Sequence, residues 1–156
     1  GKSAVDIKAI YDAHNAESNF ADTIVALTFT ETCGKGASWL LKTWLEAGNE
    51  LEQPQIEKIY GSLDQLKLWE AKLHVLQSIP FMPIADTVCS NLYAFLRITL
   101  TDSNKFVRAW SYNGLYELSR QHSKYIDETK EYFEMAMRDE VPSVKARIRN
   151  AMKKGF

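Results

Sequence analysis

Two stretches of the sequence, DSNKFVRA at Asp102–Ala109 and DEVPSVKA at Asp139–Ala146, repeat one residue pattern at an interval of 37 positions. Both begin with aspartate and carry a valine, a basic residue and an alanine in the same register. A partial copy, DQLKLWEA at Asp64–Ala71, has Trp69 in the valine position, and a fainter copy has Trp39 there. Each copy lies where one expected helix ends and the next begins. The repeating unit is therefore a helical hairpin of about 30 to 38 residues, which buries its apolar face by stacking on its neighbours.

The rest of the chain has the same helical period. Apolar residues recur at intervals of three and four, and strict alternation is nearly absent. A capping box at Ser62 and Gln65 is expected to begin the fifth helix. The sequence predicts an all-α protein with no strand. The nine expected helices are Ser3–His14, Phe20–Thr30, Ala37–Ala47, Ile56–Ser62, Gln65–Ser78, Ile84–Leu100, Lys105–Gln121, Ile126–Arg138 and Pro142–Lys154.

With these junctions, the sequence resembles the HEAT and HEAT-like (armadillo-type) repeat family. In that family each unit joins two helices around an aspartate that is followed by valine, a basic residue and a small residue. The resemblance implies a right-handed α-solenoid of about four hairpins plus an N-terminal helix, with the second helix of each pair on the concave side. The approximate repeats are 19–48, 53–79, 83–122 and 124–155, within a single domain of residues 1–156.

The residues of the junction have expected physical roles. The aspartate accepts backbone N–H groups at the start of the second helix, where a carboxylate also meets the positive end of the helix dipole. The valine enters the buried seam. The basic residue, Arg108 or Lys145, points outward or reaches toward the aspartate of a neighbouring hairpin. In the second case it forms an intramolecular ladder with Asp102 and Asp139 rather than a binding surface.

Charge is distributed unevenly between the two helices of each hairpin. The whole chain has a net charge of −1, which does not by itself indicate a nucleic-acid partner. The expected second helices contain eleven basic and three acidic residues, a net charge of +8. If these helices line the concave side, that face is basic and the rest of the molecule is acidic. The alternatives are the intramolecular ladder and an ordinary solvated face.

A second row of side chains lies one helical turn beyond the basic position of each junction. It contains Trp44, His74, Tyr112 and Arg149, all of which can stack on a base or a peptide side chain. The alternative interpretation places Trp44 in the core and makes His74 a packed or surface histidine. The candidate partner-binding residues are Trp44, Lys72, His74, Lys105, Arg108, Tyr112, Lys145 and Arg149.

No catalytic or metal-binding motif is recognisable. His14, His74 and His122 lack the paired spacing of metal ligands, and Cys33 and Cys89 are isolated in the sequence. Nucleophile elbows, kinase signatures and phosphate-binding loops are also missing from the sequence. We therefore expect no metal site, no catalytic residues and no cofactor.

The favoured function is a non-catalytic scaffold that binds a protein or peptide partner, expected to be acidic, on its concave face. The alternative is a nucleic-acid-binding HEAT-like module. Its enzymatic variant is a DNA glycosylase for alkylated bases, because some HEAT-like solenoids have that activity, and it would use Trp110, Tyr112 and Asp102. The absence of a long apolar run and the sparse cysteines favour a cytoplasmic protein without membrane contact, either monomeric or weakly dimeric.

Overall fold

The structure, a computed structural model, describes residues 5–6, 8–9 and 19–155. Residues 19–155 form eight α-helices, α2 to α9, and contain no strand. This confirms the all-α expectation and the order of the helices from Phe20 onward. The helix expected at Ser3–His14 falls mostly outside the described residues.

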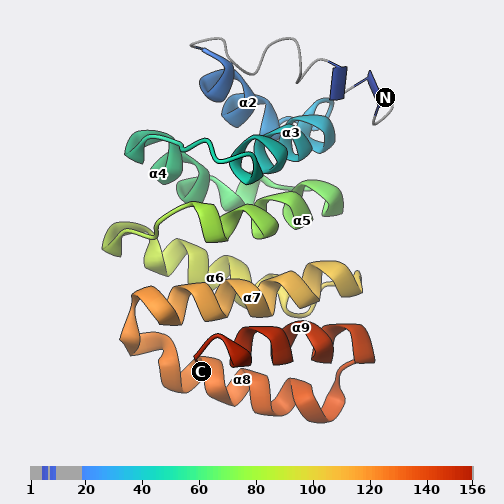
Figure 1. Cartoon of the computed structure of the whole chain (residues 1–156), viewed down its shortest axis with the longest axis vertical. Coiled ribbons are helices and arrows are strands. Elements are labelled where there is room, and N and C mark those ends of the chain that lie inside the picture. Colours follow the sequence, from blue (N-terminus) through green and yellow to red (C-terminus); the bar gives the residue numbers. More distant parts are fainter. Residues whose placement is uncertain (1–4, 7, 10–18, 156) are drawn as a thin grey trace. The chain divides into compact units, whose positions relative to one another are not determined.

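The chain divides into two compact units, and the boundary between them falls between Pro83 and Ile84. This position coincides with the expected boundary between the second and third repeats, so each unit contains two hairpins (Figure 1). The N-terminal unit contains α2 (Phe20–Thr28), α3 (Gly34–Glu46), α4 (Gln53–Gly61) and α5 (Trp69–Ser78). The C-terminal unit contains α6 (Cys89–Thr99), α7 (Lys105–Gln121), α8 (Ile126–Asp139) and α9 (Pro142–Lys153).

In the N-terminal unit, α3 packs against both α2 and α5. Leu41 and Leu45 on α3, Ile59 on α4 and Leu76 on α5 are fully buried in its core. Tyr60 is buried as well, and its hydroxyl donates a 2.6 Å hydrogen bond to the carbonyl oxygen of Met82. This contact gives a buried polar group a partner, as burial requires.

The start of α5 corrects one expectation. Ser62 and Gln65 do not form a capping box, because Leu63–Gln65 is a separate 3-10 turn and α5 begins only at Trp69. A capping box does occur earlier, at the start of α4. There the Glu52 backbone N–H donates a 2.8 Å hydrogen bond to Oε1 of Gln55.

In the C-terminal unit, α7 is the central helix and packs against α6, α8 and α9. Every residue from Ser111 to Ser119 is buried, including polar ones. Val144, Ile148 and Ala151 form the buried face of α9. Their spacing of four and three residues is that of one helix stripe, so α9 buries a single face against the unit.

The first helix of this unit starts later than the periodicity predicts. Ile84 was expected to begin it, but α6 begins at Cys89, after a 3-10 turn at Asp86–Val88. The Ile84 N–H donates to Oε1 of Gln121 at 2.8 Å, and the Ile84 carbonyl oxygen lies 2.6 Å from Nε2 of His122. These side chains hold the backbone of Ile84 outside a helix.

Candidate functional site

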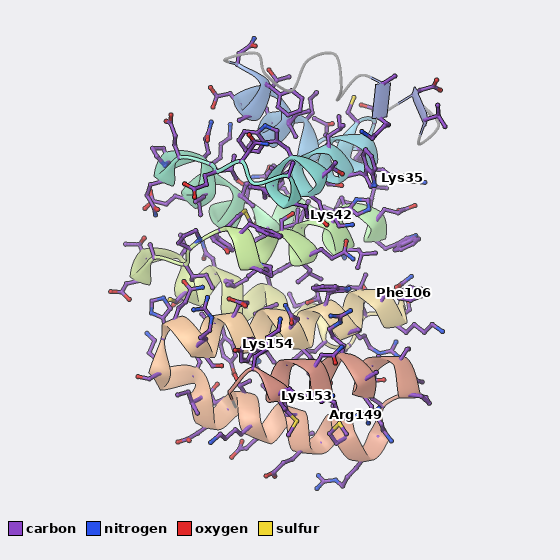
Figure 2. The ribbon with its side chains drawn as sticks, viewed as in Figure 1. Lys35, Lys42, Phe106, Arg149, Lys153 and Lys154 are labelled. Carbon is purple, nitrogen blue, oxygen red and sulfur yellow. The ribbon has the colours of Figure 1, made fainter. Side chains whose placement is uncertain are left out.

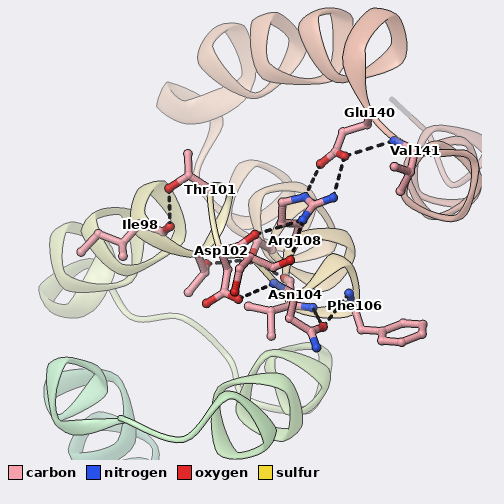
Figure 3. Close-up of polar contacts among 12 residues, drawn as sticks. Ile98, Thr101, Asp102, Asn104, Phe106, Arg108, Glu140 and Val141 are labelled. Carbon is pink, nitrogen blue, oxygen red and sulfur yellow. Dashed lines mark hydrogen bonds and ion pairs between the residues drawn. The ribbon is translucent and has the colours of Figure 1, made fainter.

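Arg108, the basic residue of the clearest junction, forms an ion pair within the molecule. Its Nε lies 2.8 Å from Glu140 Oε2, its Nη2 donates to Glu140 Oε1 at 3.1 Å, and its Nη1 donates to the Asp102 carbonyl oxygen at 3.0 Å (Figure 3). Hydrogen bonding to Arg108 lowers the pKa of the Glu140 carboxyl below its ordinary value. Arg108 therefore joins the start of α7 to the turn between α8 and α9.

This geometry agrees in part with the intramolecular ladder. Arg108 reaches the junction of the next hairpin, but it pairs with Glu140 rather than with an aspartate of the repeat pattern. Asp102 also differs from its expected role. The side chain of Asn104 caps α7 by accepting from the N–H groups of Phe106 and Val107, whereas Asp102 Oδ1 accepts from the N–H of Asn104 itself, just before the helix.

The cations on α9 have no acidic partner among the described residues. Lys145, Arg149 and Lys153 follow one another at intervals of four, so they form a stripe along one side of the helix. Arg149 and Lys153 are exposed and Lys145 is half-buried. Figure 2 labels Arg149 and Lys153 on this helix, together with Lys154 just beyond it. We call Lys145, Arg149 and Lys153 the basic stripe.

An apolar groove adjoins the basic stripe. It has a volume of about 430 Å³ and lies between α8 and α9. Met152 contributes to it from α9, three residues after Arg149 and one before Lys153. The residues that line the groove are Lys130, Phe133, Glu134, Met137, Arg138 and Met152.

The other side of α9 is occupied by a contact within the unit. The guanidinium carbon of Arg147 lies 4.1 Å from the centre of the Trp110 ring, which is a close cation–π contact between α9 and α7. Arg147 therefore does not belong to the basic stripe, and Trp110 stacks on this side chain.

Tyr112 does not lie on the surface, which corrects its assignment as a stacking residue. Only 7% of it is exposed, and its ring centre lies 6.1 Å from that of Phe133. Burial raises the pKa of its hydroxyl to about 12. A partner at the basic stripe can contact Arg149 but not the ring of Tyr112.

His74 is held within the N-terminal unit. Its Nδ1 is hydrogen-bonded to the Ser38 hydroxyl at 2.8 Å, across the contact between α5 and α3. Burial, followed by the nearby positive charge of Lys42, lowers the His74 pKa from 6.5 to about 4. His74 is therefore neutral at physiological pH and serves as a packed histidine.

Trp44 lies on a different side of α3 from the residues near His74. It follows Lys42 by two residues, which places it about 200° further around the helix. Its ring centre lies 6.2 Å from that of Phe20 on α2, and its buried Nε1 has no hydrogen-bond partner. Within the N-terminal unit, Trp44 and His74 therefore do not form a common row.

The two remaining candidate residues are accessible to different degrees. Lys72 on α5 is half-buried, and Lys105 at the start of α7 is exposed. The Lys105 ammonium lies 5.4 Å from the centre of the Phe106 ring, and half of Phe106 is exposed. On α9, Arg149 and Lys153 are exposed cations one helical turn apart.

The structure also brings together three side chains that the sequence analysis did not connect. Asp86, Cys89 and His122 place potential ligand atoms within 4.8 Å of one another. Spacing alone concealed this cluster, because 33 residues separate Cys89 from His122. Burial raises the pKa of the Cys89 thiol, while the charge of Lys124 partly opposes this shift.

No helix in the described part of the chain is long and apolar enough to cross a membrane. In comparisons with known proteins, no family model, curated protein or solved structure matches this chain.

Proposed function

We propose that the chain is a non-catalytic binding module of the HEAT-like type, and that its C-terminal unit binds an acidic, amphipathic segment of a partner protein. One observation carries this proposal: the basic stripe of α9 lacks acidic partners and adjoins the groove lined by Met137 and Met152. An amphipathic segment places acidic side chains against the cations and apolar side chains in the groove. Methionine suits such a surface because its flexible thioether adapts to different apolar partners.

The contrast with Arg108 and Arg120 supports this assignment. Each of these arginines contacts a glutamate within the unit at 2.8 Å. Because their charges are already compensated, they contribute little to the attraction of a distant partner. The stripe on α9 has no such compensation, so its field extends into solvent and accelerates the approach of an acidic ligand at low salt.

The HEAT-like part of the proposal rests on the repeated junctions and on helix pairing inside each unit. The second helices of successive hairpins pack together, α3 against α5 and α7 against α9. Arg108 further links one junction to the next. These pairings support the proposal, because stacked hairpins bury a continuous seam through contacts between neighbouring repeats.

The test uses a fluorescently labelled helical peptide with glutamates on one face and leucines on the other. Its anisotropy is measured against the full chain at low and high salt. We expect Arg149→Glu combined with Lys153→Glu to weaken binding by about tenfold or more, because two attractions become repulsions. The matched control is Lys58→Glu combined with Lys67→Glu, which makes the same change in charge at exposed positions of the N-terminal unit.

The groove is tested separately. Met152→Ser should weaken peptide binding several-fold, whereas Met135→Ser should not, although both side chains are about half exposed. Met135 does not line the groove. Equal effects of the two methionine variants, or equal effects of the two charge variants, would contradict the proposed site.

Nucleic-acid binding is the second candidate, since the same stripe of unpaired cations can follow a phosphate backbone. Labelled single- and double-stranded DNA and RNA are therefore titrated in parallel. Binding that falls steeply with salt, exceeds peptide binding and is unaffected by Met152→Ser would select this candidate instead. Failure of both peptide and nucleic acid to bind would overturn the assignment of the α9 surface.

A further inference from the structure

The turn before α6 and the end of α7 bring together three side chains that proteins use as metal ligands. Asp86 and Cys89 lie three residues apart at the start of α6, and His122 directly follows α7. Their ligand atoms, a carboxylate oxygen, a sulfur and a ring nitrogen, all lie within 4.8 Å of one another. All three residues belong to the C-terminal unit, and none belongs to the basic stripe.

The orientation of the His122 ring places Nδ1 against the Asp86 carboxylate. His122 Nε2 lies 2.6 Å from the carbonyl oxygen of Ile84, which can only accept, so Nε2 carries a proton. In the neutral ring, Nδ1 then carries no proton and presents its lone pair. This nitrogen lies 3.1 Å from Asp86 Oδ1. Two acceptors at this distance repel each other unless a proton or a metal ion lies between them. A backbone carbonyl on the other ring nitrogen is also the contact that orients metal-binding histidines.

The distances match a small tetrahedral site. Zinc bonds of about 2.0 Å to nitrogen and oxygen and 2.3 Å to sulfur place ligand atoms about 3.3 to 3.6 Å apart. The 3.1 Å between His122 Nδ1 and Asp86 Oδ1 is close to that separation. Because the sulfur lies within 4.8 Å of the other two ligand atoms, Cys89 Sγ has to approach them by about 1.3 Å at most. The Cys89 thiol is buried, and the one hydrogen bond that the structure gives it is long, 3.5 Å to the Ala85 carbonyl oxygen.

We propose that Asp86, Cys89 and His122 bind a divalent transition-metal ion, with zinc as the ion that best fits these donors. Thiolate and imidazole select zinc over calcium or magnesium, which prefer oxygen ligands. The side chain of Asp86 is 95% exposed, so the ion enters from solvent and a water completes its coordination. Binding replaces the thiol proton of Cys89, which is released to solvent. The ion then links the turn before α6 to the end of α7.

Cobalt(II) is the probe, because tetrahedral cobalt bound to thiolate has intense visible bands and a near-ultraviolet charge-transfer band. The full reduced chain is titrated with cobalt, and zinc is then added as a competitor. We expect saturation at one ion per chain and displacement of cobalt by zinc. Zinc should also raise the melting temperature of the chain, because an ion that binds only the folded state stabilises it.

Two variants test the assigned ligands. Cys89→Ser should abolish the charge-transfer band, whereas Cys33→Ser, which removes the exposed cysteine of the N-terminal unit, should retain it. Asp86→Ala should weaken zinc binding by more than about tenfold, the loss that even an outer-shell partner causes. Because the Asp86 side chain is 95% exposed, this variant should stay folded, which circular dichroism checks.

Three results would contradict the proposed metal site. If the wild-type chain gives no charge-transfer band with excess cobalt, then Asp86, Cys89 and His122 do not bind a divalent ion. If the band survives Cys89→Ser, the sulfur ligand is not Cys89. If Asp86→Ala binds zinc as tightly as the wild-type chain, the carboxylate is not a ligand. Each result would overturn the site, and none depends on the assignment of the α9 surface.

Discussion

At the scale of single residues, the ion pair between Arg108 and Glu140 should contribute measurably to stability. Its two side chains are only 19% and 13% exposed, and two hydrogen bonds join them. We expect Arg108→Ala to lower the free energy of unfolding by about 2 kcal/mol, between the values for surface and buried pairs. Urea denaturation measures the difference. Lys35→Ala is the control, because its 3.5 Å pair with Glu70 leaves Lys35 67% exposed and should cost less than about 1 kcal/mol.

The same pair predicts how the effect depends on pH. Arg108 lowers the pKa of Glu140 below its ordinary value of 4.5, so the folded state binds this proton less readily than the unfolded state. The stabilisation is fully present above pH 4.5 and is lost as the pH falls through the folded-state pKa. The difference between wild type and Arg108→Ala should therefore shrink in acid. A difference that stays constant would mean that the arginine acts through packing alone.

His74 predicts a second loss of stability, at a higher pH. Its pKa is about 4 in the folded state and 6.5 when unperturbed, so the unfolded chain binds the proton first as the pH falls. The free energy of unfolding should decrease between pH 6.5 and about 4, by at most about 1.4 kcal/mol per pH unit. His74→Gln can keep a hydrogen bond to Ser38 but cannot titrate. Urea midpoints measured across this window should fall less steeply in the variant, and equal slopes would contradict the prediction.

At the scale of helices, sequence predicts most of the pattern but not every boundary. The range Lys105–Gln121 is predicted at both ends, although the side chain that caps this helix is Asn104 rather than the expected Asp102. The start of α6 could not be predicted, because Ile84 is held out of the helix by Gln121 and His122 from a distant part of the chain. Such tertiary contacts leave no local pattern in the sequence.

The first residue of α3, Gly34, has no room for a side chain against the end of α2. A Cβ atom at Gly34 would lie 2.9 Å from the Thr28 carbonyl oxygen, a backbone atom that cannot move aside cheaply. We expect Gly34→Ala to destabilise the chain by about 1 to 3 kcal/mol. Gly61→Ala is the control, because Gly61 ends α4 with open space around it and should gain up to about 1 kcal/mol. Thermal melting of both variants measures the contrast, and a stable Gly34→Ala would show that α2 and α3 separate easily.

At the scale of the whole molecule, the candidate site was only partly predictable. The stripe positions Lys145 and Arg149 follow from the repeat register, which also assigned Tyr112 to the surface. Tyr112 is buried because α7 is packed by three helices, and its polar residues Asn113 and Glu117 are buried with it. Because α7 contains polar residues throughout, its sequence does not distinguish a central, buried helix from a helix on the surface. The cluster of Asp86, Cys89 and His122 was missed for a related reason, since only the fold joins its members.

The division at Pro83 and Ile84 predicts that the two units lose structure separately. Val144 is fully buried on the inner face of α9, so Val144→Asp places a charge in the core of the C-terminal unit and should unfold it. Amide hydrogen exchange should then be fast in α6 to α9 and remain slow in α2 to α5, because stacked repeats are stabilised by their nearest neighbours. Val141→Asp is the matched control, because Val141 is the exposed N-cap of α9, where aspartate favours the helix. Loss of protection throughout the chain in Val144→Asp would instead indicate one cooperative bundle, and would remove the basis for interpreting the hairpins as stacked repeats.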